Sequence, residues 1–126
     1  MKFALSFIAG TAIATGAFAS CPASSPNIKW NTHSGDQRVN AAFLQKTLPG
    51  MKVDFGSDGA EIYGADGTYI YRAGNQAYKA PSYKFYDDGT RCINYANPRF
   101  DLYVVNEKRL VLVNAAGARL EGKLMK

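Results

Sequence analysis

The chain has 126 residues and carries 15 Lys and Arg against 10 Asp and Glu, a formal net charge of +5. This length fits one domain, and the basic residues are scattered without a long run, which disfavours a dedicated polyanion surface and a nucleic-acid partner. One His and two Cys are too few for a structural zinc site. We therefore expect no metal and no cofactor.

The N-terminal residues 1–19 have the pattern of a secretion signal. Lys2 supplies the positive start, residues 3–14 are almost wholly apolar, and residues 17–19 (Ala-Phe-Ala) form a small-x-small cleavage site. The apolar run is shorter than the ~20 residues that a membrane-spanning helix needs. We predict a cleaved signal peptide, a mature chain from Ser20 without a transmembrane segment, and a periplasmic or secreted location.

Two cysteines, Cys21 and Cys92, remain in the mature chain. An exported chain meets an oxidising compartment, so the even count favours a disulfide between them. An alternative stays open, because residues 18–21 (Phe-Ala-Ser-Cys) resemble a bacterial lipobox. In that case Cys21 would be acylated and the protein would be an outer-membrane lipoprotein.

An irregular arm is expected over residues 20–35, which contain Pro, Ser and Asn without apolar periodicity. A helix is predicted over residues 36–48, with Ser34 or Asp36 as its N-cap and Pro49-Gly50 as its end. Its apolar stripe consists of Val39, Phe43, Leu44 and Leu48. We expect residues 36–126 to form a single small β domain led by this helix.

From residue 51 onward, apolar side chains alternate with polar ones, as in half-buried strands. Asp-Gly pairs at residues 58–59, 66–67 and 88–89 suit tight turns between them. Residues 74–81 are predicted to be a loop, because Pro81 cannot donate to a central ladder. The sequence therefore predicts a mainly β fold, an antiparallel up-and-down meander of about eight short strands in a small barrel or sandwich, with one N-terminal helix. The expected strands lie near residues 51–55, 62–63, 69–73, 83–85, 90–95, 100–105, 109–114 and 120–124.

No pattern in the sequence indicates a catalytic centre. His33 is the only histidine, and no nucleophile motif accompanies it. Residues 54–59 begin like an EF-hand loop, but Ala65 stands where that loop requires a bidentate Glu. Most aspartates occur in turns, where backbone geometry explains them. We therefore expect a protein that is not an enzyme.

The eight tyrosines are the remaining signal for function. Tyr combines a flat apolar face with a hydroxyl, which suits sugar stacking or protein contact, although Tyr also packs well in strands for structural reasons alone. We predict an exported, non-enzymatic binding module of the cell envelope that uses a Tyr/Arg/Lys-bearing sheet face to bind a protein or an envelope glycan. The alternative is a structural or accessory component of an envelope assembly, anchored at Cys21. The predicted ligand-binding residues are Tyr69, Tyr71, Arg72, Tyr83 and Arg91.

Three features together resemble the small exported lipocalin-like barrels of Gram-negative bacteria. They are the cleavable signal, the helix ending at residues 48–50 (Leu-Pro-Gly), and Asp-Gly hairpins that lead into residues 89–95 (Gly-Thr-Arg-Cys-Ile-Asn-Tyr). The resemblance covers roughly residues 50–126 and implies a small β-barrel. The only Trp, Trp30, precedes the helix, so the Gly-x-Trp signature of true lipocalins is missing and the resemblance implies no ligand-filled calyx.

Overall fold

The computed structural model describes residues 20–126, and the predicted signal peptide at residues 1–19 lies outside them. The described chain contains one α-helix, α2 (Ala41–Thr47), and one 3-10 turn, η2 (Gly56–Asp58). No helix within residues 20–126 is long and apolar enough to cross a membrane. The strands are β1 (Gln37–Arg38), β2 (Lys52–Asp54), β3 (Ala60–Tyr63), β4 (Tyr69–Ala73), β5 (Gln76–Ala80), β6 (Tyr83–Phe85), β7 (Thr90–Ile93), β8 (Arg99–Asn106), β9 (Arg109–Asn114) and β10 (Arg119–Met125).

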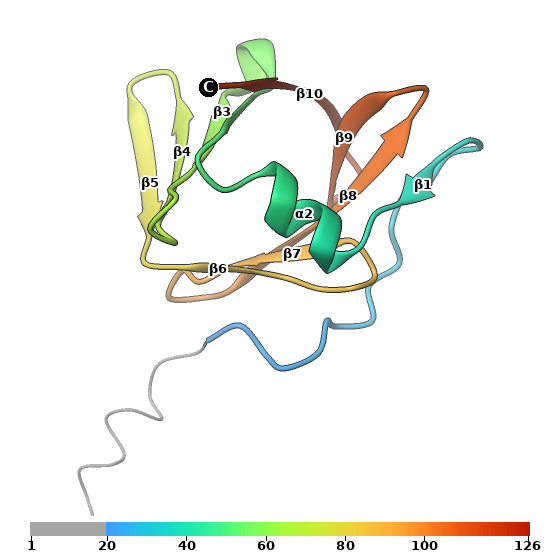
Figure 1. Ribbon diagram of the computed structural model, residues 1–126, viewed down its shortest axis with the longest axis horizontal. Helices are drawn as coiled ribbons and strands as arrows, with labels where there is room; N and C mark the ends of the chain where they lie inside the picture. Colours follow the sequence, from blue (N-terminus) through green and yellow to red (C-terminus); the bar gives the residue numbers. More distant parts are fainter. Residues whose placement is uncertain (1–19) are drawn as a thin grey trace, which may run out of the picture.

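Nine strands form one antiparallel sheet in the order β5-β4-β3-β2-β10-β9-β8-β7-β6, and β1 pairs with β8. Two meanders, β2 to β5 and β6 to β10, meet where β10 pairs with β2. The sheet curls into a half-barrel around an interior, with α2 over one of its ends (Figure 1). The mainly β, antiparallel meander is confirmed, but residues 20–126 contain ten strands and not about eight.

One added strand is β5, within the segment predicted to be a loop. Gly74, with φ of 59°, sits in a two-residue turn that folds β5 back onto β4. Pro81 comes directly after the strand ends, and β5 forms an edge of the sheet, so no ladder hydrogen bond is lost. The loop prediction was wrong because most of β5 is exposed and lacks the alternation of a half-buried strand.

The predicted helix start was also wrong. Asn40 is the N-cap, and its side-chain oxygen accepts a hydrogen bond from the Phe43 N–H at 2.9 Å. The preceding residues 37–38 are drawn into strand pairing with residues 104–105 of β8, which leaves a helix of two turns. The predicted end agrees with the structure, since Leu48 is the C-cap before Pro49.

The Asp-Gly pairs at residues 66–67 and 88–89 form the predicted tight turns, whereas the pair at residues 58–59 ends the 3-10 turn η2 between β2 and β3. The turns over residues 64–68 and 86–90 share one hydrogen-bond pattern, in which the first residue donates to the last and the glycine donates to the first. Gly67 and Gly89 have φ of 96° and 90°, the left-handed region that glycine tolerates. The side chains of Asp66 and Asp88 accept the N–H of Thr68 and Thr90, so these aspartates stabilise turns.

The arm, residues 20–35, forms neither helix nor strand but packs against the outside of the half-barrel. Cys21 is bonded to Cys92 of β7, with a Cα–Cα distance of 5.9 Å, which confirms the predicted disulfide. An acyl anchor on Cys21 would need the same sulfur, so the lipoprotein alternative does not match this structure. Further along the arm, Trp30 covers what we call the outer patch, formed by Leu102, Val104, Val111 and Val113 of β8 and β9.

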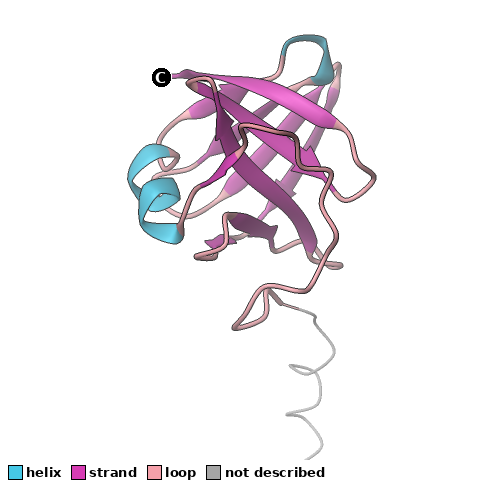
Figure 2. Cartoon of the chain, turned by 90° about the vertical axis from the view of Figure 1, so that its right-hand side faces the viewer, coloured by secondary structure: helices cyan, strands magenta, loops and turns pink. Residues whose placement is uncertain are grey.

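The interior of the half-barrel holds the larger hydrophobic cluster. Leu44 of α2 and the C-cap residue Leu48 are fully buried in it and close the end of the half-barrel that the helix covers. The turn at residues 106–109 lies at this end, whereas the turn at residues 114–118 lies at the other, because β9 runs the length of the sheet between them. Figure 2 shows α2 and η2 apart from each other on the curled sheet. The end away from α2 is called the open end below.

Candidate functional site

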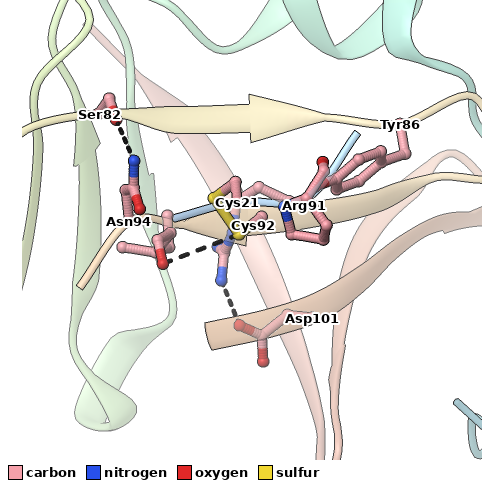
Figure 3. Close-up of a disulfide and its surroundings, with 9 residues drawn as sticks. Cys21, Ser82, Tyr86, Arg91, Cys92, Asn94 and Asp101 are labelled. Atoms are coloured by element: carbon pink, nitrogen blue, oxygen red, sulfur yellow. Dashed lines mark hydrogen bonds and ion pairs between the residues drawn. A yellow bond between two sulfur atoms is a disulfide. The ribbon is translucent and has the colours of Figure 1, made fainter. Parts of the chain in front are cut away.

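A buried arginine organises the interior near the open end. Arg91 on β7 lies directly opposite Asp101 on β8 and forms an ion pair with it. Its guanidinium also forms an ion pair with Glu61 of β3, although Arg91 is only 1% exposed. Figure 3 shows Arg91 extending toward Asp101, next to Cys92 and its disulfide. Since successive strand residues face opposite sides, the arm is linked to the outside of β7 and the ion pairs form inside.

Three tyrosines complete the hydrogen bonding of Glu61. Tyr63 and Tyr103 donate to Oε1, and Tyr69 donates to Oε2 at 2.5 Å. Arg91 also donates to the Tyr63 hydroxyl at 2.8 Å. A buried charge is tolerable when it is paired and hydrogen-bonded in this way. We call Glu61, Tyr63, Tyr69, Arg91, Asp101 and Tyr103 the interior network.

The tyrosines of this network stay neutral even at a pH at which an exposed tyrosine ionises. Burial raises the pKa of Tyr63, Tyr69 and Tyr103, and the negative charge of Glu61 raises each pKa further, against the opposing charge of Arg91. Their hydroxyls therefore act as hydrogen-bond donors to Glu61 and do not supply a phenolate.

A hollow of about 260 Å³ opens above the network at the open end. Glu61, Tyr69, Arg91 and Asp101 form its buried side. The Arg99 side chain is 54% exposed. It donates hydrogen bonds to the Asp101 carboxylate from Nε at 2.9 Å and from Nη2 at 3.1 Å. The remaining lining residues are Asp58, Tyr71, Tyr95, Leu112, Asn114, Ala118 and Leu120. We call this space the first hollow.

A second hollow of about 480 Å³ adjoins the first and is more open. It shares Arg99, Asp101 and Asn114 with the first hollow. Its other lining residues are mostly apolar and include one from the arm: Ile28, Pro98, Phe100, Ala115 and Ala116. The two hollows therefore meet along a ridge at the ends of β8 and β9.

The five residues predicted to bind a ligand do not share one surface. Tyr69, Tyr71 and Arg91 all line the first hollow. Arg72 points the other way on β4 and is exposed on the outer face. Tyr83 packs edge-on against Tyr63, with ring centroids 5.1 Å apart, and does not line the first hollow. The structure thus brings three of the five residues together in the interior, with Arg91 buried among them, and places Arg72 and Tyr83 elsewhere.

Sequence reasoning missed Glu61, Asp101, Arg99 and Tyr95. A usable signal was present, because Glu61 stands two residues before Tyr63, and Asp101 two before Tyr103. Residues two apart in a strand share a face, so both carboxylates had to face the same side as a tyrosine. Their meeting with Arg91 depends on the pairing of distant strands, which alternation alone does not reveal.

The two buried carboxylates near the open end, Glu61 and Asp101, are paired with protein groups. Glu61 and Asp101 accept hydrogen bonds from arginines and tyrosines, and residues 20–126 contain no group of three His, Cys, Asp or Glu side chains suited to a metal ion. The arrangement offers aromatic rings and N–H donors to a ligand. No protein-family model, curated protein or solved structure gives a significant match to this chain. The lipocalin-like resemblance stays a prediction.

Proposed function

We propose that this protein is an exported, non-enzymatic binding module of the cell envelope, and that it binds a residue of an envelope glycan in the first hollow. The observation that carries the proposal is a hollow at the open end, flanked by the rings of Tyr69, Tyr71 and Tyr95, with the exposed Arg99 beside them. Aromatic faces with polar groups around them suit sugars, which present C–H faces and hydroxyls.

The volume of the first hollow and the fixed positions of its tyrosine rings support a small polar ligand. Its volume of about 260 Å³ falls just below the range of about 300–1,000 Å³ that accommodates drug-sized molecules. A single sugar ring is therefore a ligand of suitable size. Tyr71 and Tyr95 are held in place, because their hydroxyls donate to the carbonyls of Asp58 and Tyr78. Rings that are fixed before binding lose little conformational entropy when a ligand arrives.

A buried donor adds to this support. Arg91 lines the first hollow, and its Nε–H meets no acceptor within residues 20–126. A buried polar group without a partner is costly, so a ligand that reaches it gains from supplying the missing acceptor.

The hydrogen bonds of the two buried carboxylates also favour a binding role over a catalytic one. Glu61 accepts from Arg91 and three tyrosines, and Asp101 accepts from Arg91 and Arg99. A general base or nucleophile needs a carboxylate oxygen that is free to contact the substrate. The oxygens of these two carboxylates already accept hydrogen bonds from protein donors. Export is supported by the signal-like residues 1–19 and by the disulfide, which persists in oxidising compartments.

The test removes aromatic rings from the first hollow and measures binding to isolated envelope polysaccharides by calorimetry. Tyr71→Ala and Tyr95→Ala should each weaken binding about tenfold, the loss expected from one stacking ring with its hydrogen bonds. Arg72→Ala is the matched control, because Arg72 is exposed on the opposite face of the same strand as Tyr71. Unfolding curves check that each variant folds. Unchanged binding after both tyrosine substitutions would contradict the proposal.

A further inference from the structure

The ridge between the two hollows presents hydrogen-bond donors that the protein leaves unused. The Arg99 guanidinium has five N–H groups. Asp101 receives hydrogen bonds from Arg99 Nε and Nη2, and no other group within residues 20–126 accepts from Arg99. The Asn114 Oδ1 accepts the Ala118 N–H at 2.9 Å, so its amide nitrogen keeps both hydrogens for another acceptor. The ridge therefore offers a cation and an amide donor together.

The charges around the ridge determine where an anion can lie. Asp101 forms ion pairs with both Arg91 and Arg99, and Glu61 forms a further ion pair with Arg91, so the charge of the buried arginine is fully paired while the Arg99 side chain stays 54% exposed. The other acidic lining residues of the first hollow are Glu61, which is buried, and Asp58, which is exposed, and both repel an anion near them. The favourable place for a negative group is on the ridge, beside the exposed end of Arg99.

We propose that the ligand is an acidic glycan and that the ridge binds a sugar carboxylate through Arg99 and Asn114. This inference rests on the proposed function and adds the class of sugar. A guanidinium suits a planar carboxylate, to which it can donate two parallel hydrogen bonds. The carboxylate-bearing ring extends into the first hollow, against Tyr71 and Tyr95.

The second hollow then receives the next sugar of the chain. Its apolar lining, which includes Ile28, Phe100 and Ala116, faces the C–H side of that sugar. The site thus spans at least two residues of the glycan, with Arg99 between them. The arm contributes to it directly, because Ile28 belongs to the arm.

The first experiment compares a uronic-acid trisaccharide with its carboxyl-reduced, neutral counterpart by calorimetry. The wild-type protein should bind the acidic form at least about tenfold more tightly, as expected for a charge-assisted pair. Arg99→Gln should abolish this preference, so that the variant binds the acidic and the neutral form with equal affinity. Arg72→Gln, on the exposed outer face, is the matched control and should keep the preference.

The outcomes separate this inference from the proposed function. Equal binding of the two forms by the wild-type protein would overturn the acidic class and leave glycan binding standing. Binding of neither form would overturn both. A preference that survives in Arg99→Gln would overturn the role of the ridge.

A second variant tests the span of the site and leaves the ridge intact. Ala116 is exposed in the turn after β9, and Ala116→Trp would fill the second hollow. The wild-type protein should bind the trisaccharide at least about tenfold more tightly than the monosaccharide, and Ala116→Trp should remove most of that gain. An unaltered gain in the variant would show that the second sugar lies elsewhere.

Discussion

The two faces of β8 are both buried, but one carries polar side chains and the other carries apolar side chains. Its inward face places Asp101 and Tyr103 in the interior network. Its outward face places Leu102 and Val104 in the outer patch, under Trp30. In most antiparallel sheets the polar face meets water, whereas here the arm covers the apolar outer face and the polar residues turn inward. The comparison shows that alternation reveals two faces but does not reveal which of them is inside.

The two regions should respond differently to substitution. The outer patch is held by apolar area, which is non-directional, so loss there is graded by the volume removed. The interior network is held by specific pairs, and removal of one partner leaves a buried charge alone. Stability measurements on single variants can therefore separate the two regions.

The largest effect is expected when the shared cation of the network is removed. Arg91→Met should lower the free energy of unfolding by about 3–5 kcal/mol, because it leaves Glu61 and Asp101 buried without their common partner. Urea unfolding measures this loss. Adding Glu61→Gln and Asp101→Asn to the same variant should recover part of it. A loss below about 1 kcal/mol would mean that the network is held as loosely as a surface ion pair.

A smaller effect is expected when the arm is released from the outside. Replacement of Cys21 and Cys92 by Ala should cost about 2–4 kcal/mol, because the cross-link constrains a long loop of the unfolded chain. The near-ultraviolet circular dichroism of the interior tyrosines should persist in the folded variant. Reduction of the wild-type protein is the control and should produce the same loss. Disappearance of the tyrosine signal in a protein that is still folded would show that the two regions are coupled.

The smallest effect concerns a single ion pair at the end of the arm. Asp36 accepts hydrogen bonds from Arg119 of β10 at 2.8 and 2.9 Å, and these hold the pKa of its carboxyl well below the usual value. A lowered native pKa adds stability above the unfolded pKa near ~3.9, and this stability is lost as the pH falls below it. Asp36→Asn should cost about 1–2 kcal/mol at neutral pH and flatten the acid limb of a stability–pH curve. An equally steep acid limb in the variant would assign the acid sensitivity to other carboxyls.

The parts of the fold that follow from local chemistry could be predicted from the sequence. Asp66-Gly67 and Asp88-Gly89 form turns because glycine supplies the positive φ that the turns require. Cys21 had one available partner in the chain. These conclusions depend only on a few neighbouring residues or on a count.

The parts that depend on distant pairing could not be predicted. Residues 37–38 became β1 only because β8 offered a partner, and an exposed segment became β5 only because β4 did. Arg91 looked like a surface cation in the sequence. Its burial follows from sheet curvature, which brings Glu61 from the other meander to its guanidinium.

The position of Cys21 has a consequence for the order of folding. Its partner lies 71 residues further along the chain, and the β8–β9 surface that Trp30 covers is also distant in sequence. Contacts between such remote segments form slowly, because loop entropy is lost before they contribute. We therefore expect the arm to dock late, with the outer patch exposed on the chain until it does. Because exposed apolar surfaces promote aggregation, we expect a chain without the arm to aggregate more readily during folding than the full chain.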